Sequence, residues 1–268
     1  MRKVFFALAA VVLLSACGEY NKVLKSSDSE YKYSYAKKYY NAGQYAKAVS
    51  LLEELYTVFK GSANAEESLY LLAQSYYGMQ DYQAASQYFG TCYNTYPNGE
   101  FAELSRYYSA YGLYLDSADP RLDQSQTYKA IEQLQLYLEY YPQSERAKSV
   151  QNLLFELQEK LAYKELLATR LYYNLGTYMG NNYLSCVITA RNALKNYPYT
   201  QYREEFLYCI IRSKYELALV SVDELLQSRY REVVDEYYNY INEFPEGKYL
   251  RQVQRFYDHV SRHIAGNY

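Results

Sequence analysis

Small and aromatic positions recur along this chain at a fixed interval. An alanine with a tyrosine three residues before it and another four residues after it occurs three times, with a step of 37 residues. The three sets are Tyr33, Ala36 and Tyr40; Tyr70, Ala73 and Tyr77; and Tyr107, Ala110 and Tyr114. Positions three and four apart lie on one face of a helix, so the interval predicts a repeated helical element.

A second pattern predicts a second helix in each repeat. A small or apolar residue is followed by bulky residues four and seven positions later and, in four of five repeats, by a proline twelve positions later. The small or apolar residues are Ala48, Ala85, Ala130, Cys186 and Val233, and the prolines are Pro97, Pro142, Pro198 and Pro245. A small residue lets two helices approach closely, and a proline cannot continue a helix, so each pattern predicts a packed helix that ends at a turn.

The later repeats depart from the regular spacing. The third repeat has eight extra residues, which predicts an insertion at about residues 116–124. Residues 145–162 predict an added helix before the fourth repeat, residues 221–224 a long link within the fifth, and residues 247–264 a closing helix. Clean period-two alternation, the signal of a strand, is absent. We therefore predict an all-α fold of about five helical hairpins plus a C-terminal helix.

The N-terminal segment predicts a cleaved lipoprotein signal. Two basic residues precede an apolar run at residues 4–14, which is shorter than the roughly 20 residues that span a membrane. Residues 14–17, Leu-Ser-Ala-Cys, resemble the bacterial lipobox, whose cysteine is acylated and becomes the first mature residue. We therefore expect lipidation at Cys17 and durable anchoring to the bilayer through its acyl chains. The alternative is an ordinary signal with a chance cysteine.

Composition excludes several classes of function. The formal net charge is −2, and removal of the two basic residues of the signal makes the mature chain more acidic, which argues against a nucleic-acid surface. Beyond Cys17, three cysteines remain far apart and without a CxxC pair: Cys92, Cys186 and Cys209. This pattern does not predict a disulfide framework, and we interpret the three thiols as small buried apolar groups.

The sequence offers little from which a catalytic or metal site could be built. A glycine-rich phosphate loop, a Gly-x-Ser-x-Gly elbow and a Cys-His or Ser-His grouping are all missing from it. His259 and His263 are four residues apart, but a zinc site needs a third ligand, and we interpret both as exposed residues near the end of a helix. We expect no enzyme activity, no cofactor and no metal.

The hairpin pattern resembles the tetratricopeptide repeat. That repeat has an alanine in its first helix, an aromatic residue three later, then Gly-x-Tyr-x-x-Ala and a closing proline. The matching residues are Ala36, Tyr39, Gly43, Tyr45 and Ala48 in the first repeat and Ala73, Tyr76, Tyr82, Ala85 and Pro97 in the second. Later repeats match more loosely. The resemblance implies a tetratricopeptide-repeat α-solenoid.

The whole arrangement resembles the BamD family of outer-membrane protein assembly lipoproteins. Its most telling pieces are Asp-Pro-Arg-Leu-Asp-Gln at 119–124 and Tyr-Tyr-Pro-Gln-Ser at 140–144, while residues 43–45 and 244–245 also fit. The high tyrosine content and the fourth repeat, with Asn-Asn-Tyr at 181–183, depart from the family.

That resemblance implies a lipid-anchored, periplasm-facing subunit of the outer membrane. Its C-terminal half would bind the periplasmic domains of the central barrel assembly subunit, and its N-terminal repeats would receive unfolded segments of outer-membrane proteins. We expect a signal peptide at residues 1–16, a lipidated tether at 17–28, repeats 1–3 at 29–144, and repeats 4–5 with the closing helix at 145–268.

Six tyrosines are candidates for the groove that receives such segments. In tetratricopeptide arrays the first helix of each repeat lines the concave face, and its fifth and twelfth positions point into the groove. Those positions are Tyr33, Tyr40, Tyr70, Tyr77, Tyr107 and Tyr114. Tyrosine combines a flat apolar face with a hydrogen-bonding tip, which suits the alternating aromatic and polar residues of outer-membrane strands. The alternative is that this stripe belongs to the core.

Two other functions stay open. One is a periplasmic tetratricopeptide scaffold lipoprotein that binds envelope or cell-division partners, and co-purification of a large barrel subunit would exclude it. The other is a SusD-like glycan-binding lipoprotein. Such proteins stack sugars on tryptophan, and this chain has 40 tyrosines and no tryptophan.

Overall fold

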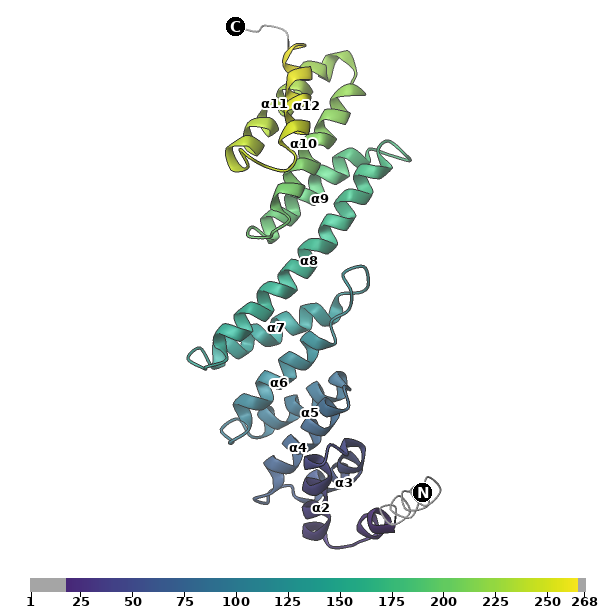
Figure 1. Ribbon diagram of the computed structural model, residues 1–268, viewed down its shortest axis with the longest axis vertical. Helices are drawn as coiled ribbons and strands as arrows, with labels where there is room; N and C mark the ends of the chain where they lie inside the picture. The colour runs from purple at the N-terminus through teal and green to yellow at the C-terminus, as the bar shows by residue number, and fades with distance from the viewer. Residues whose placement is uncertain (1–17, 265–268) are drawn as a thin grey trace, which may run out of the picture. The chain divides into compact units, whose positions relative to one another are not determined.

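A computed structural model describes residues 18–264 of the chain, and every regular element in that range is a helix (Figure 1). Residues 18–24 form a short first helix. The others are α2 (Ser29–Asn41), α3 (Tyr45–Val58), α4 (Ala65–Gly78), α5 (Tyr82–Thr95), α6 (Ala102–Leu115), α7 (Ser125–Tyr140), α8 (Ala147–Leu175), α9 (Asn182–Asn196), α10 (Arg203–Leu219), α11 (Asp223–Glu243) and α12 (Leu250–Ser261). The predicted signal peptide and Cys17 lie outside the described residues.

The helices form antiparallel pairs of the tetratricopeptide type. The pairs are α2–α3, α4–α5, α6–α7, α8–α9 and α10–α11, and α12 closes the chain. From α2 to α7, and again from α9 to α12, each helix packs against the next one in sequence (Figure 1). The predicted all-α fold of five helical hairpins plus a C-terminal helix is confirmed.

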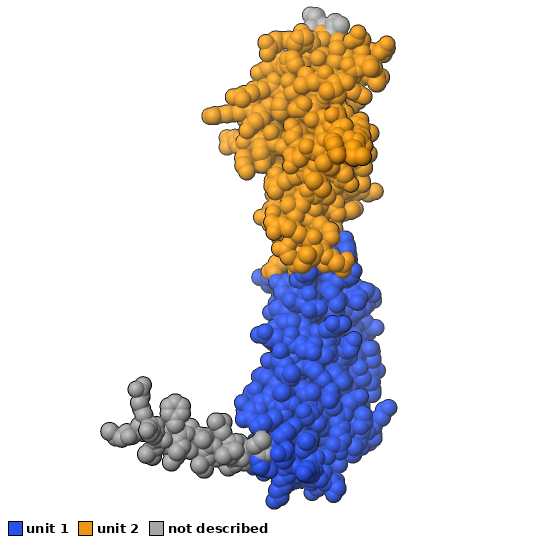
Figure 2. All heavy atoms as spheres, turned by 90° about the vertical axis from the view of Figure 1, so that its right-hand side faces the viewer, with its two compact units in different colours: residues 1–118, 124–154 blue, residues 119–123, 155–268 orange. Residues whose placement is uncertain are grey.

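Two compact units share these helices (Figure 2). Residues 1–118 and 124–154 make up unit 1, and residues 119–123 and 155–268 make up unit 2. Each unit has its own apolar core. In unit 1 the core contains Leu51, Leu52, Leu55 and Leu72, and in unit 2 it contains Leu166, Phe206, Ile211 and Tyr240.

The small residues that predicted the hairpins lie where helices meet. All three repeat alanines of the first helices, and all five small or apolar residues of the second helices, have 0% exposed surface. A short side chain lets the helix axes approach closely, and the neighbouring bulky residues fill the remaining groove. The pattern therefore marks the helix contacts themselves.

Each predicted proline stops a helix. Pro97, Pro142, Pro198 and Pro245 all lie two residues beyond the last residue of α5, α7, α9 and α11. The turn after α3 has no proline and uses Gly61 instead, whose φ of 84° is favourable only for glycine. The turn after each hairpin is therefore marked by a local residue, a proline or a glycine.

A glutamate in the first helix of each hairpin binds the turn that follows its partner helix. We call these five residues the turn glutamates. Their bonds are Asn64 Nδ2 to Glu30 at 3.0 Å, Phe101 N–H to Glu66 at 2.8 Å, the Ser144 hydroxyl to Glu103 at 2.7 Å, Gln201 N–H to Glu159 at 3.2 Å and Tyr249 N–H to Glu204 at 3.3 Å. The bonded residues are 34 to 45 positions apart, so each bond joins successive hairpins.

Two sequence predictions about the later repeats were wrong. Residues 145–162 do not form a separate helix, because α8 continues without a break for 29 residues. The segment contains neither glycine nor proline, so nothing in it ends the helix. The link in the fifth repeat is also short, at residues 220–222, because Asp223 and Glu224 start α11, where a helix dipole favours acidic residues.

Two other predictions about these repeats are confirmed. The insertion in the third repeat forms the connection between α6, which ends at Leu115, and α7, which begins at Ser125. The closing helix is α12, and its buried residues Val253 and Val260 pack into the core of unit 2.

Candidate functional site

The six candidate tyrosines differ in how far they are buried. Tyr33 is 2% exposed, whereas Tyr40, Tyr70, Tyr77, Tyr107 and Tyr114 are partly exposed. All six lie in unit 1, on the first helices of the first three hairpins. Their surroundings decide which of them could meet a ligand.

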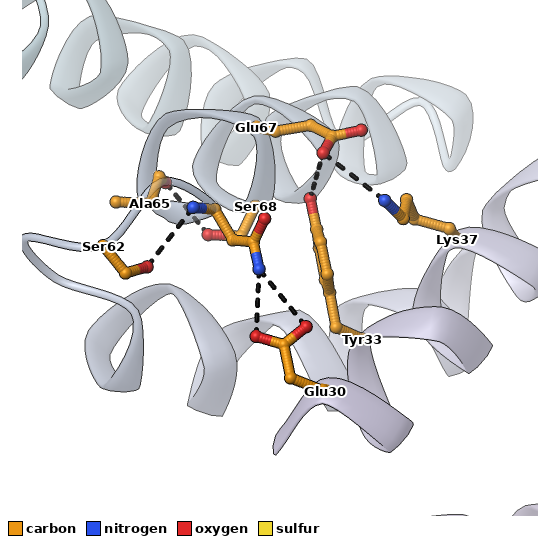
Figure 3. Close-up of polar contacts among 8 residues, drawn as sticks. Glu30, Tyr33, Lys37, Ser62, Ala65, Glu67 and Ser68 are labelled. Atoms are coloured by element: carbon orange, nitrogen blue, oxygen red, sulfur yellow. Dashed lines mark hydrogen bonds and ion pairs between the residues drawn. The ribbon is translucent and has the colours of Figure 1, made fainter.

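Tyr33 belongs to the core of the first hairpin. Its ring packs edge-on against Phe59, with 5.2 Å between ring centroids. Its hydroxyl donates to Glu67 of α4 at 2.7 Å, and Lys37 lies 4.4 Å above its ring and 3.5 Å from the same carboxylate (Figure 3). Burial, followed by the bond to Glu67, raises the pKa of Tyr33. Its contacts therefore join two hairpins.

Tyr40 and Tyr70 each pack against a ring outside the six candidates. The Tyr40 ring contacts Tyr45 of α3 at 5.9 Å. The Tyr70 ring stacks on Phe101 at 4.4 Å with an angle of 19° between the planes, and its hydroxyl accepts a bond from Gln74 at 2.8 Å. Burial raises the pKa of Tyr70 to about 12, so its phenol stays neutral.

The remaining three candidates meet in one group of rings. Tyr107 lies parallel to Tyr111 at 5.6 Å, and Tyr111 lies parallel to Tyr114 at 5.6 Å. Tyr77, in the last turn of α4, lies 5.4 Å from Tyr108 and 6.5 Å from Tyr111. We call Tyr77, Tyr107, Tyr108, Tyr111 and Tyr114 the tyrosine cluster. The prediction that the stripe binds a ligand stays a prediction at this point.

Local sequence explains how α6 supplies this group. Tyr107, Tyr111 and Tyr114 are four and three residues apart, which places their rings on one helical face. On the opposite side of α6, Gly112 lies close to the backbone of α5. A Cβ at this position would be 3.3 Å from the carbonyl oxygen of Tyr82. The close contact on one side leaves the tyrosine face of α6 available on the other.

Sequence reasoning missed Tyr108 and Tyr111. The 37-residue interval hid Tyr111, because its equivalents in the two earlier repeats are Gln74 and Lys37. The local spacing could have identified Tyr111, because it lies four residues after Tyr107 and three before Tyr114, on the same helical face. Tyr108 also stacks on Phe89 at 5.6 Å, and Phe89 in turn contacts Tyr70 at 5.8 Å.

The cluster offers phenol groups that can form hydrogen bonds. Burial, followed by the neighbouring phenols, raises the pKa of Tyr77 to about 12, and burial also raises the pKa of Tyr107. Arg146 lies 5.7 Å from the Tyr107 ring and provides a positive charge at the edge. The arrangement can therefore offer flat apolar faces, hydroxyl groups and one guanidinium, but no group for covalent chemistry.

The two histidines form no metal site. His259 is half-buried and its Nδ1 is 2.7 Å from the Tyr215 hydroxyl, whereas His263 is exposed. The prediction of an exposed side chain was therefore wrong for His259, because α12 packs it against α10. Within residues 18–264, His, Cys, Asp and Glu form no group of three or more that could hold a metal ion.

Cys92, Cys186 and Cys209 are buried, as predicted, and their thiols are not cross-linked in this structure. Cys92 lies in the core of unit 1, and Cys186 and Cys209 lie in unit 2. Every helix of the described range is too short or too polar to span a membrane.

Comparison with known proteins connects this fold to a family. The family model YfiO, described as "Outer membrane lipoprotein", matches residues 25–225. The "Outer membrane protein assembly factor BamD" of Neisseria meningitidis serogroup B is 25% identical over 281 residues, which cover 95% of this chain and 96% of that protein. These matches confirm the resemblance inferred from the lipobox and the repeats. Because the family model covers most of the chain, this protein belongs to the YfiO family of outer membrane lipoproteins.

Proposed function

We propose that this chain is a non-catalytic scaffold lipoprotein of the machinery that assembles outer-membrane proteins. It is anchored by acyl chains on Cys17, binds the periplasmic domains of the central barrel assembly subunit, and receives unfolded segments of client outer-membrane proteins. Its signal peptide comprises residues 1–16 and its tether residues 17–28, followed by client-receiving repeats at 29–144 and subunit-binding repeats at 145–268. Family membership and the assembly role named for the Neisseria relative support this proposal.

The tyrosine cluster is the observation that carries the client-binding part. Its five rings are partly exposed, and each ring centroid lies 5.3 to 6.5 Å from that of at least one other ring of the cluster on α4 or α6. Strands of outer-membrane proteins alternate apolar and polar residues and carry aromatic girdles at both membrane interfaces. Flat phenol faces match the aromatic residues of such a strand, and the hydroxyls match its polar residues and its unpaired backbone groups.

Contacts within the cluster also lower the cost of binding. A side chain that must be ordered on binding costs about 0.5–1.5 kcal/mol, and tyrosine has few rotatable bonds. Here Tyr107, Tyr111 and Tyr114 already stack against one another with interplanar angles of 13° and 9°. The surface is thus ordered before a client arrives, so it can hold short and varied segments.

Peptide binding tests the client role. A fluorescently labelled peptide with the sequence of one outer-membrane β-strand is titrated with the chain, and anisotropy reports affinity. We expect Tyr77→Ala and Tyr111→Ala each to weaken binding about tenfold, the loss typical of an aromatic contact at the centre of an interface. Far-UV circular dichroism must show unchanged helix content in both variants.

Tyr163→Ala is the matched control. Tyr163 is also a half-buried helical tyrosine with one ring neighbour, Tyr202 at 5.3 Å, but it lies in unit 2. This variant should bind the peptide as the unchanged chain does. Equal affinity of all four proteins, or equal weakening by Tyr163→Ala, contradicts a client site at the tyrosine cluster.

The scaffold role has its own test. Affinity capture of the tagged, full-length lipoprotein from detergent-solubilised envelopes, followed by mass spectrometry, should recover a large outer-membrane barrel protein with periplasmic domains. Capture of cell-division or peptidoglycan-associated proteins without such a barrel would identify another kind of envelope scaffold.

A further inference from the structure

Two buried thiols face each other in unit 2. Cys186 lies on α9 and Cys209 on α10, and both have 0% exposed surface. The Cys186 thiol is 3.8 Å from the carbonyl oxygen of Cys209, to which it donates, and it also contacts the Cys209 thiol. Cys186 occupies the small-residue position of the fourth repeat, where two helices approach closely. The two side chains therefore meet at the helix crossing itself.

A guanidinium lies beside this pair. Arg212 Nη2 is 3.5 Å from the Cys209 sulfur, and the Arg212 guanidinium stacks on the ring of Tyr173 at 3.5 Å. Arg212 Nε is buried and has no hydrogen-bond partner among the described residues. A fixed positive charge next to two thiols stabilises the thiolate form of either one, which is the form that attacks a disulfide.

The two sulfurs are not equivalent. Contact with the Cys209 thiol, followed by Ser213 and Arg212, outweighs burial and lowers the pKa of Cys186. Contact with Cys186 and burial raise the pKa of Cys209. An asymmetric pair of this kind has one thiol that reacts first and one that resolves the product.

Cys92 provides an internal comparison. It is also buried, but it is the one cysteine of unit 1 in the described range, and burial raises its pKa to about 11. A thiol in that environment is an inert apolar group.

The geometry points to a modification site: we propose that Cys186 and Cys209 form a disulfide that cross-links α9 to α10. An outer membrane lipoprotein folds in the oxidising space beneath that membrane, where disulfides form and persist. This inference rests on the family assignment and not on the proposed client or scaffold role.

The oxidant is an external disulfide carried by a thiol oxidase of the envelope. The Cys186 thiolate attacks one sulfur of that disulfide, whose S–S bond breaks and releases a thiolate. The Cys209 thiolate then attacks the Cys186 sulfur, forms the new S–S bond and releases the second external thiol. The chain loses two protons and two electrons, and the external disulfide gains them. Because both thiols have 0% exposed surface in the folded chain, the exchange takes place during folding, after α9 and α10 meet at these residues and before the surrounding helices cover them.

The cross-link stabilises unit 2 by restricting its unfolded chain. It closes the loop between residues 186 and 209, which contains the turn at Pro198. For a loop of this size, reduction should lower the Tm of unit 2 by about 5 °C or more.

Thiol mapping of the full-length lipoprotein tests the inference directly. Envelopes are treated with N-ethylmaleimide under denaturing conditions, the protein is then reduced and treated with iodoacetamide, and peptide mass spectrometry identifies each label. We expect the iodoacetamide label on Cys186 and Cys209 and the maleimide label on Cys92. Maleimide on Cys186 and Cys209 in protein from the envelope overturns the proposal.

Single variants separate the cross-link from simple packing. Dithiothreitol should lower the Tm of the unchanged protein and of Cys92→Ser. It should leave the Tm of Cys186→Ser and of Cys209→Ser unchanged. Each comparison is made within one protein, so destabilisation by the substitution itself does not affect it. A reductant effect that persists in Cys186→Ser also overturns the proposal. Peptide binding to the tyrosine cluster is measured separately and reports on the proposed function alone.

Discussion

At the scale of single residues, the carboxylate of Glu236 joins three helices of unit 2. Glu236 lies on α11 and accepts bonds from Arg191 of α9 at 2.7 Å and from Lys214 of α10 at 2.8 Å. Its side chain is 8% exposed and that of Lys214 is 11% exposed, so water screens this pair weakly. Removing one partner of such a pair leaves a largely buried charge without its counterpart.

We expect Glu236→Gln to destabilise the chain by about 2 kcal/mol at pH 7, less than for a fully buried pair because Lys214 keeps a second acidic neighbour. That neighbour is Glu232, which is 53% exposed and 3.2 Å from the Lys214 ammonium. Glu232→Gln is therefore the matched control, and it should cost less than about 0.5 kcal/mol. Urea unfolding measures both values, and equal costs would show that burial does not strengthen the Glu236 pair.

The pH dependence of this effect has a definite sign. Burial raises the pKa of Glu236, but Lys214, Asn239 and Arg191 together outweigh burial and lower it from the usual 4.5. A carboxyl with a lowered folded-state pKa contributes its stability above the unfolded pKa and loses it as the pH falls through the folded pKa. The difference in unfolding free energy between the unchanged chain and Glu236→Gln should therefore be largest near pH 7 and become smaller below about pH 4.

At the scale of elements, the sequence predicts hairpins well where the repeat is strict and poorly where it loosens. The helices α2 to α6 follow the 37-residue interval, because the same small residues must lie at each helix contact, whereas the insertion displaces α7. The continuous α8 and the early start of α11 were missed, because helix continuation leaves no mark in the sequence beyond the absence of glycine and proline.

The candidate site could likewise be predicted only where it follows the repeat interval. The stripe of Tyr77, Tyr107 and Tyr114 follows from the interval, because one helical face repeats. The contacts of Tyr108 with Tyr77 and Phe89 do not follow from it, since they depend on how α4, α5 and α6 pack together. Burial of Tyr33 likewise depends on Phe59, which directly follows α3, and on Glu67 of α4.

The turn glutamates give a prediction at this scale. The hydroxyl of the fully buried Tyr240 donates to Glu204 at 2.6 Å and accepts the N–H of Tyr249 at 3.1 Å, and so holds the turn between α11 and α12. Tyr240→Phe keeps the ring but removes a hydrogen bond to a charged group, which should cost about 2 kcal/mol. Hydrogen exchange should become faster at residues 245–250 before it does so in α9.

Tyr238→Phe is the control for this substitution. Tyr238 is 48% exposed, and its hydroxyl lies 3.4 Å from that of Tyr257. Its loss should leave stability and exchange unchanged within about 0.5 kcal/mol. If hydrogen exchange in α12 also becomes faster in Tyr238→Phe, the effect is a general loosening of the α11–α12 pair and not the loss of the Tyr240 hydrogen bonds.

At the scale of the whole molecule, attachment to the membrane and folding are separate properties of the chain. None of the helices in residues 18–264 is suited to cross a bilayer. The helical hairpins bury apolar residues inside each of the two units. Under the proposed function, membrane attachment depends on acylation of Cys17, where several acyl chains at ~0.8 kcal/mol per buried methylene would give durable anchoring.

Substitution of one sulfur should therefore release the chain from membranes. We expect the unchanged lipoprotein, purified in detergent, to enter the detergent phase in Triton X-114 partitioning, and Cys17→Ser to enter the aqueous phase with the same circular dichroism spectrum and Tm. Partitioning of the purified chain removes partner proteins, which could hold a non-acylated chain at the membrane. Cys92→Ser should partition as the unchanged lipoprotein does, because its sulfur lies in the core of unit 1. A Cys17→Ser chain that stays in the detergent phase would show that the polypeptide itself binds lipid, and the anchoring part of the proposed function would fail.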